Sequence, residues 1–467
     1  MKKLYRIFIV ILAASLAACD FDLNQSPITE KESSNFFKSE IEIEEAVYGV
    51  YGALRSNGVY ELGIPVIGEI SSDNTFDEVP ANDGGNYGEL DEFTVIPSNS
   101  VIASIWKDSY VAIQRANVVL NRIGDIPFKD EYVKQNRIGE MKFLRGLLYF
   151  NLVRIYGDVP LIIEETTDVN AAFGVERAAV SEVYNQIIQD LKAAIEVLPL
   201  DGGADGRAEK GAAQALLAKV HLTLKDYANA KQLLDQVQSS GQYGLLESGN
   251  DIFAIANKGN REVMFAVKFE SGINGNSMGS SIFRMCTPSG YYASGKGHNI
   301  PTEQLYSLYE DGDLRKESYV KHVEGIYYVS GKMDAPTTVP DDAGNDFVVL
   351  RFADVLLMSA EVENELGNTA LAAEMLNKVR QRSGASEVLA DGQVTLRSTI
   401  AAERQMELVG EGHRWFDLLR TGQAIEVMNK HFAERGQNIV VDQDNLLMPI
   451  PQSQIDADPV LNQNPGY

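Results

Sequence analysis

The chain has 467 residues, of which 45% are hydrophobic and 23% are charged, and this balance excludes a disordered, a collagen-like or a polytopic membrane protein. There are 41 lysine and arginine residues against 66 aspartate and glutamate residues, so the formal net charge is -25. A field of that sign repels phosphate groups, and we therefore expect no nucleic-acid partner.

The N-terminus is typical of an exported lipoprotein. Basic residues precede an apolar run from Ile7 to Leu16, which is shorter than the roughly 20 residues of a membrane-spanning helix, so residues 1–18 are predicted to be a signal peptide. The run ends in the letters L-A-A-C, a lipobox, which predicts acylation of Cys19. Residues 19–35 are polar and lack a helical period, so we expect an extended tether. Ordinary secretion with a chance cysteine is the alternative.

Apolar residues recur at helical spacing along the first half of the folded body. The stripes Ile43–Leu54, Trp106–Leu120 and Val183–Leu198 each predict one amphipathic helix, and Trp106 is interpreted as a core residue because it belongs to such a stripe. Residues 140–161 are apolar on nearly all sides and contain Gly157 near their end. This pattern predicts a central buried helix with a glycine stop.

Two later segments resemble each other, since Ala218 aligns with Ala360 and Leu224 with Leu366 when residues 215–237 are laid over a stretch further along the chain. Each segment has a helix, a tight turn and a second helix with small inner residues, which is the plan of a tetratricopeptide repeat. The fold class that follows is mainly α, with about four tetratricopeptide-like helix pairs.

The helical period lapses after the third predicted pair, where Gly, Ser and Asn are frequent. Short β-like runs predict a few strands at residues 263–269, 326–330 and 347–350. We expect one domain over residues 36–467, with the helix pairs mainly at 40–240 and 350–420 and a loop-rich insertion at about 240–346. Long ordered loops on a rigid scaffold are where binding residues usually lie.

No motif of an enzyme or a metal site stands out. The five histidines show no metal-ligand spacing, and no phosphate-binding G-x-x-x-x-G-K is present. Residues 275–279 match G-x-S-x-G, but a nucleophile elbow needs a strand that runs directly into the serine, and none is expected there. Glycosidase carboxylates stay open, because a sequence does not reveal which acids lie close in space. We expect no cofactor, no metal and no catalytic residue.

The segment 403–422 is dense in charge around Trp415. Two of its charge pairs fall at i,i+3 spacing: Glu411 with Arg414, and Asp417 with Arg420. We interpret this segment as a partly buried ion-pair network that packs Trp415 into the scaffold. An active site is the alternative.

Several strings together resemble the SusD/RagB family, the surface nutrient-binding lipoproteins of the Bacteroidetes. They are the lipobox, "IWKDSYVAIQRANVVLNRI", "EMKFLRGLLYFNLVRIYGDVPL", "RFADVLLMSAEVENELGN", "EGHRWFDLLRTG" and "LLMPIPQSQIDADPVLNQNPGY". The resemblance implies a right-handed superhelical stack of four helix pairs with a loop-rich second half. It also implies a lipid-anchored protein of the outer membrane that binds glycan, or peptide in the RagB branch, has no enzymatic activity and works with a SusC-like TonB-dependent transporter.

The same resemblance implies that ligand contacts come from the loop between the first two helices and from the insertion. Members that bind long glycans often display exposed tryptophans, whereas both tryptophans here are interpreted as structural, so tyrosine and phenylalanine, a small sugar or a peptide are the alternatives. Aromatic rings pack on pyranose C–H groups while amides and carboxylates bond the hydroxyls. The candidate ligand-binding residues are Asp73, Asn74, Phe76, Tyr87, Tyr291, Tyr292, Asn299, Tyr327 and Tyr328.

Four functions stay open. The first is a glycan-binding lipoprotein that faces the cell exterior and delivers nutrient to a transporter. The second is a peptide-binding member of the same family. The third is a glycoside hydrolase on a helical scaffold, and the fourth is a periplasmic scaffold that binds only protein.

Overall fold

The computed structural model describes most of the predicted folded body. The described residues are 36–168, 173–200, 206–273, 278–291, 295–323, 325, 327–335, 337 and 339–467. The signal peptide, Cys19 and the tether lie outside these ranges, as do Ser277 and Tyr292. Within the described ranges, no helix is both long enough and apolar enough to cross a membrane.

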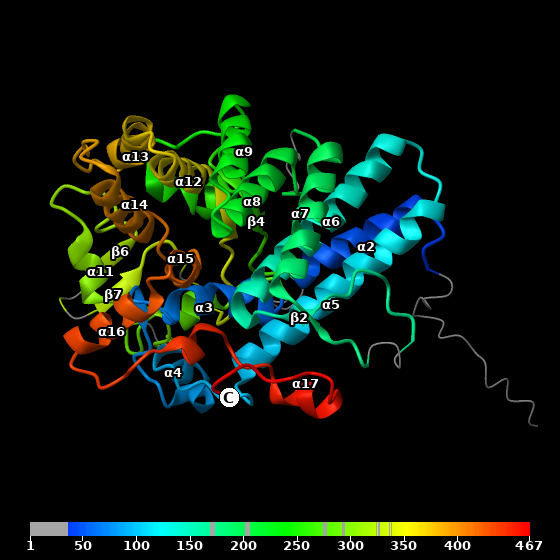
Figure 1. Cartoon of the computed structure of the whole chain (residues 1–467), viewed down its shortest axis with the longest axis horizontal. Coiled ribbons are helices and arrows are strands. Elements are labelled where there is room, and N and C mark those ends of the chain that lie inside the picture. Colours follow the sequence, from blue (N-terminus) through cyan, green and yellow to red (C-terminus); the bar gives the residue numbers. More distant parts are fainter. Residues whose placement is uncertain are drawn as a thin grey trace, which may run out of the picture.

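The body is mainly helical, and its helices include four successive packed pairs (Figure 1). The pairs are α2 (Glu40–Ala53) with α5 (Ser100–Arg122), α6 (Glu131–Tyr156) with α7 (Val180–Val197), α8 (Lys210–Thr223) with α9 (Tyr227–Ser239), and α12 (Phe352–Glu365) with α13 (Thr369–Arg382). Each pair also contacts the next, since α6 packs on α5, α8 on α7 and α12 on α9. The predicted helix pairs are therefore confirmed, and they form one continuous stack.

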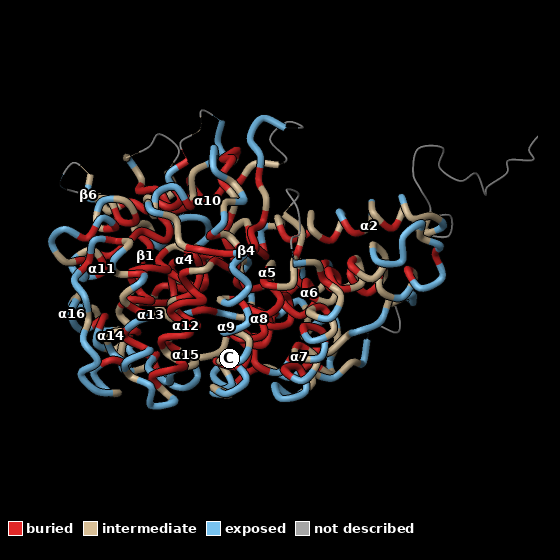
Figure 2. Tube along the Cα trace, turned by 90° about the horizontal axis from the view of Figure 1, so that it is seen from above, coloured by how far each residue is buried: buried red, intermediate tan, exposed pale blue. Residues whose placement is uncertain are grey.

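Helix α6 is buried within this stack. From Phe143 to Tyr156 every side chain except that of Arg154 is buried, as expected for a helix that is apolar on nearly all sides (Figure 2). The helix ends at Gly157, whose φ of 71° is a left-handed conformation that glycine adopts without steric cost. Trp106 of α5 is buried with its ring centroid 5.1 Å from that of Tyr156, so its assignment to the core is confirmed.

The predicted strands are confirmed, and each has an antiparallel partner. The pairs are β4 (Val263–Val267) with β8 (Phe347–Arg351), β6 (Val320–Val323) with β7 (Tyr327–Ser330), β1 (Thr75–Phe76) with β5 (Ile300–Pro301), and β2 (Val159–Pro160) with β3 (Arg177–Ala178). The described sheets have two strands each. Two-stranded ribbons are too small to supply a core of their own, so the insertion depends on the helices for its stability.

Further helices complete the body, and α3 and α15 lie near its centre in Figure 1. They are α3 (Gly63–Ile70), α4 (Asn86–Asp91), α10 (Ile282–Met285), α11 (Glu303–Leu308), α14 (Gln393–Glu407), α15 (Arg414–Thr421), α16 (Ala424–Glu434) and α17 (Gln452–Ala457). Single turns of other helix types occur at Asn57–Glu61, Asn82–Gly85, Ile123–Asp125, Gly249–Ile252, Ile255–Asn257 and Gln443–Leu446.

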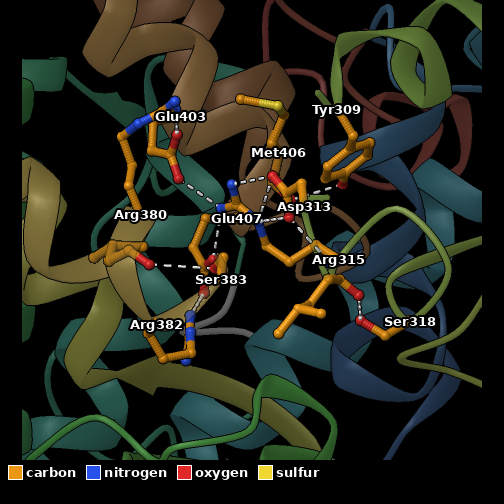
Figure 3. Close-up of polar contacts among 12 residues, drawn as sticks. Tyr309, Asp313, Arg315, Ser318, Arg380, Arg382, Ser383, Glu403, Met406 and Glu407 are labelled. Atoms are coloured by element: carbon orange, nitrogen blue, oxygen red, sulfur yellow. Dashed lines mark hydrogen bonds and ion pairs between the residues drawn. The ribbon is translucent and has the colours of Figure 1, made fainter. Parts of the chain in front are cut away.

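A buried ion-pair network fastens the insertion to α13 and α14. Figure 3 shows Arg315 of the insertion bonded to Asp313, Glu403 and Glu407, with 2.6 Å from its guanidinium to Glu403 and 2.9 Å to Glu407. Arg380 and Arg382 of α13 bind the same two glutamates. Charges are tolerated away from water only when they are paired and hydrogen-bonded, so each of these groups requires the others.

The charged segment 403–422 divides into two helices, with Glu411 in the turn between them. The Asp417–Arg420 pair is present at 2.8 Å. The predicted Glu411–Arg414 pair is wrong, because α15 begins only at Arg414 and Glu411 lies in the turn before it. Glu411 instead lies 2.7 Å from Arg351, and Arg414 binds Asp73 in the first half of the chain. Trp415 is 2% exposed, so the packing interpretation is confirmed.

Helix α3 touches the turn between α14 and α15 backbone to backbone. A Cβ added to Gly68 would lie 2.3 Å from the carbonyl oxygen of Gly412, closer than real Cβ atoms come. Gly412 has a φ of 76° and donates its N–H to Glu69 over 2.9 Å. Burial raises the pKa of the Glu69 carboxyl to about 7. The first and last parts of the chain therefore meet at a contact that only glycine permits.

Candidate functional site

Two segments far apart in the sequence form one surface. We call residues 71–91, which follow α3, the first site loop, and the described residues 281–291 and 295–301 of the insertion the second site loop. Strand β1 of the first pairs with β5 of the second. The N–H of Glu78 donates to the carbonyl of Gly297, and the N–H of Ser289 donates to the Glu78 carboxylate, each over 2.8 Å. Two of the regions that were predicted separately therefore lie side by side.

A pocket of about 380 Å³ opens beside this contact. Its walls come from both site loops, the first turn of α5, the segment before α3 and, further along the insertion, Asp341. The lining residues are Asn57, Glu61, Leu62, Asp83, Asn86, Tyr87, Ser100, Val101, Ser281, Arg284, Met285, Lys296 and Asp341. Amide, hydroxyl and charged groups alternate there around one aromatic ring, which is the mixture that sugar hydroxyls and C–H faces require.

Two ion pairs set the charge of the pocket. Lys296 Nζ lies 2.8 Å from Asp83 Oδ1, and an Arg284 guanidinium nitrogen lies 2.5 Å from Asp341 Oδ2. The hydrogen bond from Lys296 lowers the pKa of Asp83, so this carboxylate stays ionised near neutral pH. Four of the five charged side chains of the pocket are thus paired, and the fifth, Glu61, accepts a hydrogen bond from Ser281. The pocket therefore suits a neutral polyhydroxyl ligand better than a highly charged one.

Tyr87 supplies the aromatic ring of the pocket. It lies on α4, is 9% exposed, and stacks on the imidazole of His298 with ring centroids 4.3 Å apart. Burial raises the pKa of its hydroxyl, which therefore stays protonated as a donor. The ring is held rigidly from behind, so a ligand that reaches it would meet a surface that is already positioned.

Asp73 and Asn74 fasten the first site loop to the helices and do not line the pocket. Asp73 Oδ1 lies 2.7 Å from Arg414 Nε. Asn74 is 1% exposed, donates to Glu69 over 2.8 Å and accepts from Gln405 over 3.0 Å. The expectation of ligand contact at Asn74 is therefore corrected, because its amide is buried and bonded to protein groups.

Phe76 and Asn299 also serve contacts within the protein. The guanidinium of Arg435 lies 4.8 Å from the centroid of the Phe76 ring. Asn299 is buried, accepts a hydrogen bond from Thr75 over 2.6 Å, and has a φ of 58°. Ligand contact at Asn299 is thus also corrected, since its side chain joins the two site loops from inside.

The doublet Tyr327–Tyr328 divides between two surfaces. Successive side chains of a strand point to opposite faces, and both residues lie in β7. Tyr327 is 5.9 Å from Tyr291 of the second site loop, centroid to centroid. Tyr328 stacks on His322 at 4.7 Å and packs beside Tyr306. Both tyrosines of the doublet are half-buried, but only Tyr327 belongs to the surface that carries Tyr291.

Several residues of the pocket escaped sequence reasoning. They are Asn57, Glu61, Asp83, Asn86, Ser281, Arg284, Lys296 and Asp341. Asp83, Asn86 and Lys296 lie inside the two predicted loops, so their polarity was a signal available there. Glu61 and Asp341 follow no local pattern, and only the fold brings them to the pocket.

Other cavities are less suited to a sugar. A larger cavity, of about 760 Å³, lies between α5, the segment after β2 and α17, and its walls are mainly apolar. A third, of about 240 Å³, is lined by arginines such as Arg404 and Arg420 that are already paired with carboxylates. Among the described residues, no group of three or more His, Cys, Asp or Glu side chains could hold a metal ion, and Cys286 is a buried free thiol.

Comparison with known proteins gives consistent results along the chain. The family model "Starch-binding associating with outer membrane" matches residues 23–222, and the model "SusD family" matches residues 316–467. SusD-like protein P25 of Formosa agariphila is 25% identical, with 100% of both chains covered. A solved "Laminarin binding SusD-like protein" is 31% identical over 92% of this chain and 100% of that chain, with a TM-score of 0.79.

A more distant structure has the same fold. Surface glycan-binding protein A from Bacteroides thetaiotaomicron, solved in complex with laminarihexaose, is 22% identical, covers 91% of this chain and 100% of its own, and has a TM-score of 0.77. The matched ranges, the helix pairs and the 31% identity over nearly the whole chain agree. The chain belongs to the SusD family.

Proposed function

We propose that this protein binds a glycan at the cell surface and holds an oligosaccharide in the pocket between the site loops. The observation that carries the proposal is the composition of that pocket, in which Tyr87 is surrounded by amide, hydroxyl and ion-paired groups. Its volume of about 380 Å³ lies within the range of roughly 300–1,000 Å³ that small ligands occupy. The relative with 31% identity is described as laminarin-binding, so β-glucan oligosaccharides are the first ligand class to test.

Tyr291 and Tyr327 extend the proposed site beyond the pocket. Their rings are neighbours on the second site loop and β7, and the turn that carries Tyr291 is tied to Glu78 of the first site loop through Ser289. A second aromatic surface near the pocket would stack on the next sugar unit of a chain.

Calorimetric titration with laminarin oligosaccharides tests the site. Truncating one stacking aromatic costs about 1 to 3 kcal/mol of binding free energy, so Tyr87→Ala and Tyr291→Ala should each weaken binding by about 5- to 150-fold. Tyr132→Ala is the matched control, because this tyrosine is exposed at the start of α6. Unchanged affinity in both site variants, each shown to be folded, would contradict the assignment. Glycan and peptide arrays on the wild type would then show whether another glycan or a peptide is bound.

We propose that the protein binds its glycan without cleaving it. A glycosidase uses a pair of carboxyls, but two of the three pocket carboxylates, Asp83 and Asp341, each face a cation. Only Glu61, whose pKa burial raises, is left as a carboxyl suited to donate a proton. Prolonged incubation with laminarin oligosaccharides should leave them intact by chromatography. Appearance of shorter products from the purified wild type, absent with a Glu61→Gln variant, would establish hydrolysis instead.

The proposed setting is the outer membrane, with a lipid on Cys19, the body facing the exterior and a SusC-like TonB-dependent transporter as partner. The lipobox and the family description of outer-membrane association support this setting. Cys19→Ala should move the protein from the membrane fraction to the soluble fraction. A variant that stays in the membrane, together with a native protein whose mass lacks acyl chains, would contradict the anchor. Co-purification of a transporter from detergent extracts tests the partner.

A further inference from the structure

His298 belongs to the second site loop and contacts three side chains of the first site loop. The His298 side chain is fully buried. Nδ1 lies 2.9 Å from Asp77 Oδ1, and Nε2 lies 2.8 Å from Asp83 Oδ2. One face of the ring stacks on Tyr87, 4.3 Å between centroids. Two of these three partners, Asp83 and Tyr87, line the pocket.

The hydrogen-bond chemistry of this contact requires a charged ring. Ionised carboxylates only accept hydrogen bonds, and a neutral imidazole has one N–H and one bare nitrogen. A neutral His298 would therefore point a lone pair at Asp77 or at Asp83. With both nitrogens protonated, each carboxylate receives a charge-assisted hydrogen bond, which is about twice as strong as a neutral one.

We propose that His298 is a positioning residue which, as an imidazolium, clamps Asp77 to Asp83 and thereby holds the Tyr87 ring and the Asp83–Lys296 pair at the ligand pocket. This inference rests on the proposed function for its glycan readout, although the clamp itself can be tested without ligand. Glycan affinity should fall when His298 loses its proton.

The backbone of the first site loop supports the clamp. Asp83 has a φ of 48°, and the two glycines that follow it have φ of 75° and 81°. A left-handed conformation costs a residue with a Cβ free energy, and such strain persists only where surrounding contacts impose it. The contacts of the Asp83 carboxylate with His298 and Lys296 hold this turn together with the hydrogen bond from Asn86 to the Asp83 carbonyl.

Few of the groups around His298 change their charge in the pH range in which His298 is tested. The charged or titratable side chains near it are Asp77, Glu78, Asp83, Tyr87 and Asp91 of the first site loop, Cys286 and Lys296 of the second, and Glu61 beside the pocket. Burial raises the pKa of Cys286 to about 12 and raises that of Tyr87, so both stay neutral between pH 6 and 9. Asp91 and Glu61 are the exceptions. Burial raises the pKa of Asp91 to about 7, and Asp91 accepts the N–H of Asp77. Burial also raises the pKa of Glu61.

The direction of the pH effect follows from the contacts. Burial alone would lower the pKa of His298, but the hydrogen bonds to Asp77 and Asp83 outweigh it and raise the pKa above 6.5. The clamp is therefore complete below pH 6.5 and is lost as pH rises through the higher value in the folded protein. His221 offers an internal contrast, since burial lowers its pKa below 6.5 even though Asp226 lies 3.0 Å away.

An NMR pH titration of the histidine rings in the mature chain tests the clamp directly. His298 should titrate above pH 6.5 and His221 below it, with His298→Asn used only to identify the resonance. A His298 pKa at or below 6.5 would overturn the proposal, whatever the protein binds. If His298→Asn does not fold, Asp83→Asn identifies the same resonance by lowering its pKa.

The dependence of glycan affinity on pH tests the positioning role. Laminarin oligosaccharides should bind the wild type about tenfold more weakly at pH 9 than at pH 6, the effect of losing one charge-assisted hydrogen bond. His221→Asn and Asp91→Asn should keep this difference, and His298→Asn should bind weakly at both pH values. Equal wild-type affinity at pH 6 and 9, with a raised His298 pKa, would overturn the positioning role.

A different result would separate the clamp from the proposed function. If no glycan binds at any pH, the proposed function fails, and hydrogen exchange of residues 77–91 decides the clamp. Protection that falls above the His298 pKa in the wild type supports the clamp. Protection that is equal at pH 6 and 9, after correction for the intrinsic exchange rate, overturns it.

Discussion

The helix stack and the insertion are held by different forces. In the stack, α6 buries Leu144 and Leu148 against neighbouring helices, and its contacts are mainly apolar, with the buried Arg145–Asp190 pair to α7 as an exception. In the insertion, Arg315 and Lys332 reach carboxylates on α14 and in the turn after it. Apolar packing is non-directional, whereas a buried ion pair needs its partner at bonding distance. The stack therefore depends on many contacts of similar kind, and the insertion depends on a few specific ones.

Removing a cation from the network should have the largest effect. Arg351 binds Glu262, Glu407 and Glu411 at 2.7 to 3.0 Å, so Arg351→Leu leaves three carboxylates without this partner. Breaking a buried pair in this way costs about 3 to 5 kcal/mol of unfolding free energy. The matched control is Arg397→Leu, whose side chain is 44% exposed beside Glu365 and whose loss should cost less than about 1 kcal/mol. Urea denaturation measures the unfolding free energy of both variants. Similar losses for Arg351→Leu and Arg397→Leu would contradict the expectation that buried ion pairs matter more than exposed ones.

A cavity in the stack should cost slightly less. Leu144→Ala on α6 removes a fully buried leucine, which costs about 3 kcal/mol in a well-packed core. Since no charge changes, the loss should be the same at pH 7 and pH 4. Leu389→Ala is the control, because this leucine is exposed. A loss for Leu144→Ala that changes strongly with pH would show that the packing around Leu144 is coupled to ionised groups such as the Arg145–Asp190 pair.

The network should make the protein sensitive to acid. Burial alone would raise the pKa of Glu411, but Arg351 and Lys332 lower it below 4.5. A carboxyl whose folded pKa is lowered adds stability that is present above its unfolded value and lost as pH falls through the folded one. The melting temperature should fall as pH drops below 4.5, and Glu411→Gln should reduce that fall. The exposed Glu426→Gln should leave the pH profile unchanged.

The smallest effect on stability is expected in the pocket itself. Arg284 and Asp341 form an ion pair like those of the network, but both are partly exposed. Arg284→Ala should therefore cost less than about 1 kcal/mol of unfolding free energy, while laminarin-oligosaccharide affinity falls several-fold because a donor is lost. Thermal melts and calorimetry on the same sample measure both quantities. A large loss of stability with unchanged affinity would place this pair with the structural network.

Local sequence patterns predicted the elements but not their long-range partners. The stripe of α2 and the glycine stop of α6 follow from periods of a few residues, so they are visible in the sequence. The partner of β4 is β8, far along the chain, and no local period identifies it. The same holds for Glu411, which has Arg414 three residues away yet pairs with Arg351 across the fold.

For the site, the loops were predicted better than the residues. Composition indicated both loops that form the pocket, because their tyrosines lie among Gly, Ser and Asn and outside the periodic apolar positions of any helix. It did not separate Tyr87, which lines the pocket, from Asn74, which is buried under α14 through Gln405. Burial of a loop side chain depends on what covers the loop, and that is decided by tertiary packing.

The contact between Gly68 and Gly412 limits which parts of the chain can be expressed as separate proteins. The two family models match residues 23–222 and 316–467, and each range resembles a module that could be expressed alone. Cutting between them would separate the two glycines, and it would also expose the apolar face of α3 to water. Truncated proteins from this chain should aggregate, whereas changes in length confined to loops between the two ranges leave this junction in place.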